Sequence, residues 1–208
     1  MSARGGGESC DLLVVGAGPA GCAAAVAARR AAPALRVLVG DAARFPREKP
    51  CGGALTGGAQ RELERCGLAL RVRHAVVTHA RLRVDGRERR VELPRPAAVV
   101  RRVELDHDLV GQARAAGATV LEGVPLLGLR GAAAATGAGE VRFRALVAAD
   151  GVGSAARRAL GLPAGRRAPL RETHLAGAGQ WDLLFDLDAP GAGYGTSQFV
   201  SVQVIGND

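Results

Sequence analysis

Aromatic side chains are scarce in this chain of 208 residues. They make up 3% of it, with one tryptophan, Trp181, and one tyrosine, Tyr194. Proteins that bind single-stranded nucleic acid by stacking need several exposed rings, so the scarcity argues against that class. The net charge of +8 comes mainly from arginines scattered in pairs, and no recognisable nucleic-acid-binding module accompanies them. We therefore expect no nucleic-acid partner.

Cysteine is also scarce, and its spacing indicates neither a disulfide framework nor a zinc site. No two of the four cysteines form a CxxC pair, and the four histidines show no mutual spacing typical of metal ligands. One of them, His107, is expected on the surface of a helix. Reduced thiols are typical of a cytosolic protein. We expect no metal site and a cytoplasmic location.

A long uninterrupted hydrophobic run is missing as well. Residues 12–28 carry no charge, but glycines and a proline break the stretch. It is too short for a confident membrane span, and no signal-peptide cleavage site is set off from it. We expect a soluble protein.

Glycine is abundant instead, with 30 residues, and three of them form a GxGxxG pattern near the start of the chain. Before this pattern, the apolar run 11–15 predicts a strand buried on both faces. After it, residues 22–32 predict a helix with arginines in its last turn, and residues 35–39 predict a second buried strand. Together these segments predict a right-handed βαβ unit.

The three glycines, Gly16, Gly18 and Gly21, have steric reasons to stand in this pattern. The first permits a tight turn, the second lets the backbone approach a pyrophosphate, and the third lets helix and strand pack closely. Asp41 follows the second strand, where a carboxylate can accept hydrogen bonds from both hydroxyls of an adenosine ribose. The pattern predicts a dinucleotide site, although it does not separate FAD from NAD. The alternative is a glycine-rich turn in an unrelated α/β protein.

The rest of the chain interleaves helices with antiparallel pieces, which indicates a nucleotide-binding core with an inserted sheet. The predicted elements are a helix at 55–67, a hairpin at 75–93 with Asp85-Gly86 at its tip, a helix at 102–117, strands at 118–124 and 126–131, a loose hairpin loop at 132–140, a strand pair at 141–150 and a helix capped by Ser154.

Four stretches resemble the FAD-dependent geranylgeranyl reductase family, which belongs to the larger group that shares the fold of p-hydroxybenzoate hydroxylase and the flavin halogenases. They are "VVGAGPAGCAAA", "RFPREKPCGG", "VVRRVELDHDLVGQARAAGATVLEGV" and "LVAADGVGSAARRALGL". The second carries the P-x-x-K-x-C-G-G segment of the family, here Pro46, Lys49, Cys51, Gly52 and Gly53. This segment narrows the choice most, because the first and last stretches are common to many flavoproteins.

The resemblance implies an α/β fold, a Rossmann-like FAD-binding domain of the GR2 type with an inserted antiparallel β-sheet. The FAD-binding domain would comprise residues 10–72 and 97–165, and an incomplete substrate-domain sheet would comprise 73–96 and 166–208. FAD is the implied cofactor. Its expected contacts are Gly16, Gly18, Pro19, Ala20, Gly21, Asp41, Arg101, Val124, Asp150 and Gly151.

The implied reaction is reduction of an isolated carbon–carbon double bond of a prenyl chain. Cys51 and Lys49 would be the catalytic residues near the flavin ring, with Cys51 protonating or orienting the alkene, and Tyr194 would contact the substrate. The electron donor stays open between NAD(P)H and a reduced carrier protein. The sequence has no second GxGxxG pattern that would indicate a separate NAD(P)H domain. A lipophilic substrate implies transient contact with a membrane surface, which positive charge assists. The enzymatic alternative on the same scaffold is an aromatic monooxygenase.

The end of the chain departs from the family pattern. The family has a P-x-x-Y-x-W-x-F-P segment, of which this sequence holds the tyrosine, Tyr194, but has Thr196 where the tryptophan is expected. Residues 196–208 match nothing further in the family. The chain is therefore expected to be the front half of such an enzyme with an unrelated tail. A truncated FAD-binding protein without turnover is the third reading.

Overall fold

The structure is a computed structural model that describes residues 8–163, 180–186 and 204–207. The chain divides into two compact units, and each is described by itself. The first contains the chain up to Lys49, residues Leu63–Arg71, and the chain from Val103 to the end of the described range at 163. The second contains Pro50–Glu62, Val72–Arg102 and the two short described segments near the C-terminus.

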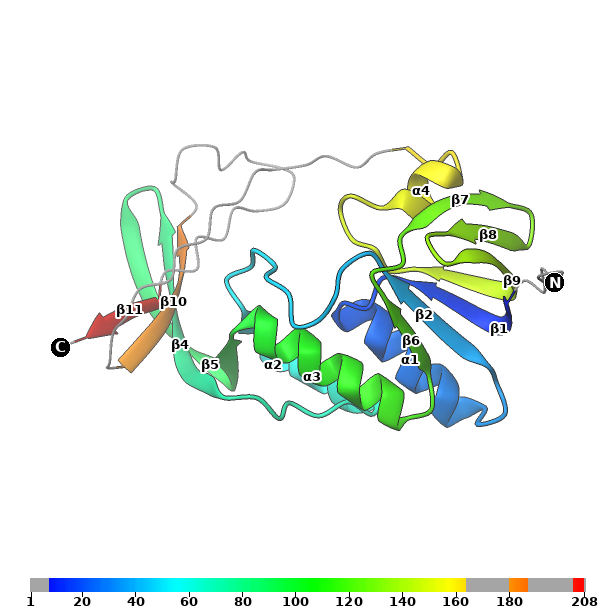
Figure 1. Ribbon diagram of the computed structural model, residues 1–208. Coiled ribbons are helices and arrows are strands. Elements are labelled where there is room, and N and C mark those ends of the chain that lie inside the picture. The colour runs from blue at the N-terminus through cyan, green and yellow to red at the C-terminus, as the bar shows by residue number, and fades with distance from the viewer. Residues whose placement is uncertain (1–7, 164–179, 187–203, 208) are drawn as a thin grey trace, which may run out of the picture. The chain divides into compact units, whose positions relative to one another are not determined.

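A six-stranded sheet in the order β6-β2-β1-β9-β8-β7 forms the centre of the first unit (Figure 1). Four neighbouring strands are parallel to one another, and β8 and β7 extend the sheet with antiparallel pairs. The strands are β1 (Glu8–Val15), β2 (Val37–Asp41), β6 (Thr119–Glu122), β7 (Leu126–Arg130), β8 (Ala133–Thr136) and β9 (Gly139–Ala148). The helices of this part are α1 (Pro19–Ala31), α3 (Arg102–Ala115) and α4 (Ala155–Ala159).

Burial explains why these segments form strands and helices here. Val14 in β1 and Val39 in β2 have no exposed surface, as expected for parallel strands covered on both faces. Leu105 and Leu109 of α3 are also fully buried, because residues four apart lie on one face of a helix. The predicted βαβ unit is confirmed, with a helix that begins at Pro19 and a second strand that ends at Asp41.

The second unit has a sheet in the order β11-β10-β4-β5-β3. Its strands are β3 (Ala54–Leu55), β4 (His74–Val84), β5 (Arg87–Val100), β10 (Gln180–Asp186) and β11 (Val204–Asn207), and α2 (Gly57–Cys66) follows β3. The turn between β4 and β5 places Asp85 at φ 50° and Gly86 at φ 70°. Two successive positive φ angles are typical of the hairpin turn that Asp-Gly favours, so the predicted hairpin is confirmed.

Two of the predicted strand assignments differ from the structure. Residues 141–150 were expected to form a strand pair, but residues 141–148 belong to the single strand β9, and the expected loop 132–140 contains β8 and the start of β9. Alanine is a weak strand former, yet Ala134 of β8 is fully buried in the core cluster of this sheet, so tertiary packing overrides the local preference.

Strand β5 is longer than the predicted hairpin arm, because it continues through two prolines to Val100. Proline lacks the N–H that a strand ladder needs, so it is tolerated at irregular positions of a sheet. The register of the β4–β5 pair shifts between Val77 and His79, opposite the stretch that holds Pro94 and Pro96. The prolines therefore lie where the ladder is already interrupted.

The predicted mixed α/β class is confirmed. The predicted domain limits stay a prediction, and the two units found here group residues 50–62 and 97–102 with the sheet of the second unit, in which β10 and β4 are parallel and the other pairs antiparallel. None of the helices in the described ranges is long and apolar enough to cross a membrane.

Candidate functional site

The loop between β1 and α1 carries the GxGxxG pattern, and two of its glycines are required by the packing of the chain itself. Gly16 has φ +100°, and a Cβ atom there would lie 2.5 Å from the carbonyl oxygen of Ala149. A Cβ atom on Gly21 would collide with the carbonyl oxygen of Gly16. Both positions therefore need glycine whether or not a ligand binds.

Gly18 differs, because no contact within the described ranges requires a glycine there. Its backbone is extended, with φ −73° and ψ −176°, a conformation open to any residue. A Cβ atom would meet only Nη2 of Arg47, at an ordinary 3.8 Å. The space that a side chain would fill lies at the start of α1, whose N-cap has no side-chain hydrogen bond and whose first residue is Pro19. A helix start of this kind binds phosphate groups through its N–H groups and dipole.

Asp41 ties the end of β2 to this loop. Its Oδ2 accepts a hydrogen bond from the N–H of Ala17 at 2.7 Å, and its Oδ1 accepts one from the N–H of Ala43 at 2.8 Å. The predicted ribose acceptor therefore also has a structural role that the sequence did not reveal. Each carboxylate oxygen has a second lone pair, so hydroxyl groups of a ribose can still donate to it.

Asp150, at the end of β9, presents a buried acceptor. Its Oδ2 accepts hydrogen bonds from the N–H groups of Ala155 and Ala156 at the start of α4. Its Oδ1 is buried and has no hydrogen-bond partner among the described residues. A buried acceptor without a hydrogen bond destabilises the folded protein. The hydroxyl groups of the ribityl chain of a bound FAD would supply donors. Beside it, Gly151 has φ +73° and open space where a Cβ would stand.

The end of β6 holds the loop that follows Asp41. Oε2 of Glu122 accepts a hydrogen bond from the N–H of Phe45 at 2.6 Å, and Oε1 accepts one from Arg114 at 2.7 Å. The Phe45 N–H and then Arg114 hold the pKa of Glu122 below its ordinary value. The N–H of Val124 donates to the carbonyl of Asp41 at 2.8 Å. Val124, a predicted cofactor contact, thus lies at the same edge of the sheet as Asp41.

Arg47 and Asp106 form an ion pair near the glycine loop that the sequence analysis missed. Nη1 of Arg47 lies 3.2 Å from Oδ2 of Asp106, whose side chain has no exposed surface. The guanidinium also lies over the ring of Phe45, 5.0 Å from its centroid. The one signal in the sequence was a charged residue, Asp106, next to Leu105 and three residues before Leu109, both of which are buried in α3.

Burial makes Cys22 of α1 chemically inert. The thiol has no exposed surface and its Sγ donates to the carbonyl of Ala17. Burial, followed by the negative charges of Asp106 and Asp41, raises the pKa of Cys22 to about 12. All four cysteines lie in the described part of the chain, and none forms a disulfide.

The remaining predicted residues lie elsewhere. Lys49 is exposed and ends the first segment of the first unit, whereas Cys51 is half-buried and belongs, like Arg101, to the second unit. In that unit Gly53 has φ +69° and a Cβ there would collide with the carbonyl of Val100, so this glycine has a packing role. Tyr194 lies outside the described residues. The structure therefore brings together the glycine loop, Asp41, Val124 and Asp150, and their roles as cofactor contacts stay predictions.

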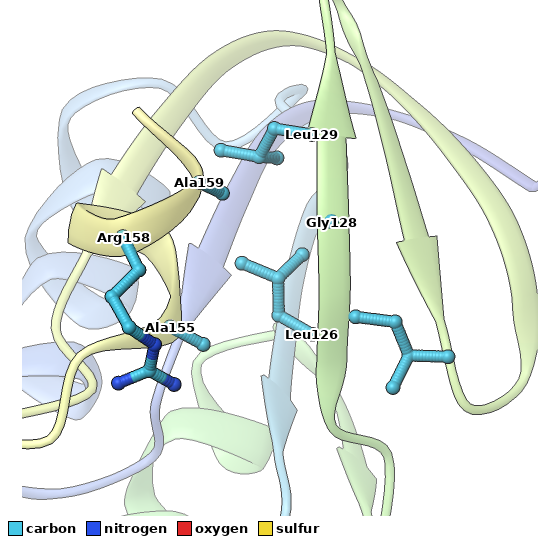
Figure 2. A pocket seen from close by; sticks show the side chains of 7 residues that line it. Leu126, Gly128, Leu129, Ala155, Arg158 and Ala159 are labelled. Carbon is cyan, nitrogen blue, oxygen red and sulfur yellow. The ribbon is translucent and has the colours of Figure 1, made fainter. Parts of the chain in front are cut away.

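A separate hollow of about 390 Å³ lies between β7 and α4. Figure 2 shows Leu126 and Leu129 of β7 opposite Ala155 and Ala159 of α4, with Arg158 beside them. None of the residues that line it belongs to the glycine loop. The hollow is therefore separate from the glycine loop.

Comparison with known proteins supports a flavin site. Residues 9–178 match the model of the FAD binding domain family. Among curated proteins, the menaquinone reductase of Mycolicibacterium smegmatis is 42% identical over 128 residues, which cover 56% of this chain and 30% of that protein. The menaquinone reductase of Mycobacterium tuberculosis is 43% identical over 123 residues, 56% of this chain and 29% of that protein. The chain thus matches less than a third of the length of these relatives.

Solved structures share the fold. A geranylgeranyl bacteriochlorophyll reductase-like protein from Thermoplasma acidophilum has a TM-score of 0.65 and 28% identity, over 76% of this chain and 43% of that one. PqsL from Pseudomonas aeruginosa, described as a probable FAD-dependent monooxygenase, has a TM-score of 0.63 over 78% of this chain and 48% of that one. At 20% identity, this second likeness shows the fold alone.

These findings agree with the geometry of the first unit. The space at Gly18 and the unpartnered Oδ1 of Asp150 are features that a bound dinucleotide would fill and satisfy. The prediction of FAD as cofactor and of a Rossmann-like FAD-binding fold is confirmed. With a match that extends over residues 9–178, the chain belongs to the FAD binding domain family.

Proposed function

We propose that the protein is a flavin-dependent oxidoreductase, or the FAD-binding part of one, that reduces an isolated double bond in the prenyl chain of a lipid. The observation that carries the proposal is the 42% identity to a menaquinone reductase. Menaquinone has a prenyl side chain, and the likeness to a geranylgeranyl reductase-like structure supports the same chemical group as substrate.

The residues of the first unit would bind the cofactor. The first turn of α1 and the space at Gly18 would receive the pyrophosphate, Asp41 would accept from the adenosine ribose, and Oδ1 of Asp150 would accept from the ribityl chain. When bound, FAD supplies the electron pair of the reduction after a donor such as NAD(P)H or a reduced carrier protein has reduced it.

Saturation of a double bond also requires a proton. We assign this step to Cys51, a half-buried thiol that follows Lys49 by two residues in the segment that resembles the reductase family. The thiol would donate its proton to the second carbon of the double bond or orient the alkene, and Lys49 would support it. A prenyl lipid lies in a membrane, so the protein would touch an anionic membrane surface transiently, helped by its net charge of +8.

The direct test uses the purified chain with FAD, a chemical reductant and menaquinone, without oxygen. We expect a product that has gained two hydrogens in its side chain and keeps them after the quinone ring is reoxidised in air. Reduction that disappears on reoxidation would place the reaction at the ring and contradict the proposal. No reduction by a sample whose visible spectrum shows bound FAD would favour a non-catalytic FAD-binding protein. Hydroxylation of an aromatic substrate with consumption of oxygen would favour the monooxygenase.

The role of Cys51 has its own test. We expect Cys51→Ala to lower the rate of alkene reduction about 100-fold, as is typical for loss of a proton donor, with FAD binding unchanged. Cys66→Ala is the matched control, because Cys66 is another half-buried thiol. An unchanged rate in Cys51→Ala would remove Cys51 from the mechanism.

A further inference from the structure

We propose that Arg47 binds the pyrophosphate of FAD and that the buried carboxylate of Asp106 holds it in position. The inference rests on the FAD-binding part of the proposed function and not on the reaction or its substrate. Arg47 was not among the expected cofactor contacts, and the argument depends on its surroundings in the first unit.

The position of Arg47 at the glycine loop is the first observation. A Cβ on Gly18 would lie 3.8 Å from Nη2 of Arg47, and within the described residues no other atom outside its chain neighbours and its own helix comes within 4 Å of it. The guanidinium therefore borders the space at the start of α1 where the chain leaves room for a ligand. A group bound there would meet the N–H groups of the helix on one side and the guanidinium on the other.

The anchoring of Arg47 is the second observation. On one side of the guanidinium, Asp106 lies 3.2 Å from Nη1 and is fully buried. On another side, the ring of Phe45 lies 5.0 Å from the guanidinium carbon. An arginine held by a carboxylate and an aromatic face loses little further conformational freedom when it binds an anion.

The hydrogen-bonding capacity of Arg47 is the third observation. A guanidinium has five N–H donors. Nη1 is buried against Asp106, so the nitrogen that can face a ligand is Nη2, which borders the space at Gly18. The side chain is 18% exposed, so it remains accessible at the loop. A diphosphate supplies acceptors for two parallel N–H groups at once, which is the arrangement that a guanidinium favours.

The local charge balance also requires a cation at this place. Asp41 and Asp106 both lie near Cys22 in the first turns of α1, where they raise the pKa of its thiol, and Arg47 opposes them. A diphosphate at the loop would approach both carboxylates, and the positive charge of Arg47 reduces that repulsion. Arg47 thus compensates Asp106 and makes the loop suitable for an anion.

Binding of ADP, AMP and adenosine to the full chain, measured by calorimetry, tests the proposal. ADP is the adenosine diphosphate part of FAD, and its binding needs no redox chemistry. We expect Arg47→Gln to weaken ADP binding about 10- to 100-fold, the usual effect of losing a charge-assisted hydrogen bond, to weaken AMP binding less, and to leave adenosine binding unchanged. Arg47→Lys should recover part of the ADP affinity.

Two further variants control for a merely structural role. Arg44→Gln removes the same charge from an exposed side chain of the same loop and should bind ADP as the wild type does. Arg47→Gln combined with Asp106→Asn removes both charges of the ion pair, and should bind ADP weakly but adenosine normally. Equal losses for all three ligands, unchanged ADP affinity in Arg47→Gln, or a wild type that binds ADP no more tightly than adenosine would each overturn the proposal. None of these results depends on whether prenyl reduction occurs.

Discussion

The glycines of the fingerprint look alike in the sequence but differ in what surrounds them. A Cβ on Gly16 or Gly21 would collide with backbone atoms of the chain, whereas a Cβ on Gly18 would make only an ordinary contact with the Arg47 side chain. Steric rules explain why a glycine stands at each position, but only the coordinates separate the glycines that the fold needs from the one that a ligand needs. This distinction leads to a prediction for single-methyl changes.

We expect Gly18→Ala to change the free energy of unfolding of the FAD-free protein by no more than about 0.5 kcal/mol. The added methyl group would lie no closer than 3.8 Å to the Arg47 side chain, which is an ordinary contact. The same methyl would occupy the space for the pyrophosphate, so the affinity for FAD should fall about tenfold or more. Denaturant unfolding and fluorescence titration with FAD measure the two quantities. Gly21→Ala is the contrast, and we expect it to impair folding itself. Full FAD affinity in Gly18→Ala would contradict this assignment.

The thiols also separate by their surroundings. At pH 8 a disulfide reagent should react with Cys51 and Cys66 of the folded protein, both half-buried, and should not modify Cys22. With a pKa of about 12, Cys22 has a thiolate fraction of roughly 10⁻⁴ at that pH, in addition to being fully buried. Mass spectrometry of digested protein identifies the modified residue, and labelling in denaturant is the control. Labelling of Cys22 at the rate of Cys51 would contradict the packing of α1.

At the scale of elements, contacts with the end of β6 help to fix the conformation of the loop after β2. The contacts of Glu122 with the Phe45 N–H and Arg114 fix the segment that carries Arg47. These partners are 77 and 8 residues away in the chain. A loop with such anchors keeps its shape when nothing is bound, which favours binding by reducing the entropy lost.

This anchor predicts a dependence of stability on pH. The folded pKa of Glu122 lies below its ordinary value of 4.5, mainly because of the Phe45 N–H, with Arg114 and His107 also lowering it. The stabilisation of the folded state by ionised Glu122 is therefore fully present above pH 4.5. It is lost as the pH falls through the lowered pKa of the folded state. We expect Glu122→Gln to be less stable by about 1 kcal/mol at pH 7. The difference should narrow below pH 4.5 in urea unfolding measured over a pH series, and a constant difference down to pH 3 would contradict it.

The helices and strands that the sequence predicted correctly are those that short stretches of the chain specify by themselves. The strand–glycine–helix start and the Asp-Gly hairpin were predicted because apolar runs and turn residues specify them locally. Strand β8 was not, because its alanines are weak strand formers and form a strand only between β7 and β9. The full length of β5 was missed because two prolines conceal a strand that a register shift accommodates.

The candidate site shows the same limit. Asp41 and Asp150 were predicted because each ends a strand beside a glycine motif. The ion pair of Arg47 with Asp106 joins a loop to a helix 59 residues later in the chain, and no local pattern specifies such a contact. A charge on the buried face of a helix indicates that a partner exists, but not which residue it is.

For the whole molecule, cofactor binding should appear as stabilisation. A ligand that binds only the folded state at 100 times its dissociation constant adds about 2.7 kcal/mol, which corresponds to a rise of roughly 5–11 °C in thermal midpoint for a chain of this size. We expect this rise with FAD in differential scanning calorimetry. Riboflavin, which lacks the ADP part, should have no such effect if the described site holds that part. An equal shift with riboflavin would place the binding energy elsewhere.

The pairing of the first strand with β9 has a consequence for synthesis of the protein. Glu8 pairs with Val141 and Val15 with Ala148. Strand β1 is therefore synthesised well before β9, its neighbour in the sheet. The hairpin of β4 and β5 can form earlier, because its arms are adjacent in the chain. The proposed FAD contacts are also made far apart in time. The ribosome adds about 115 residues between Asp41 and Ala156, the last residue that Asp150 binds, which takes roughly 6–23 s at common rates of synthesis. During that interval β1 lacks its β9 neighbour, and the residues proposed to hold FAD are not yet all made, so the cofactor cannot yet stabilise the nascent chain.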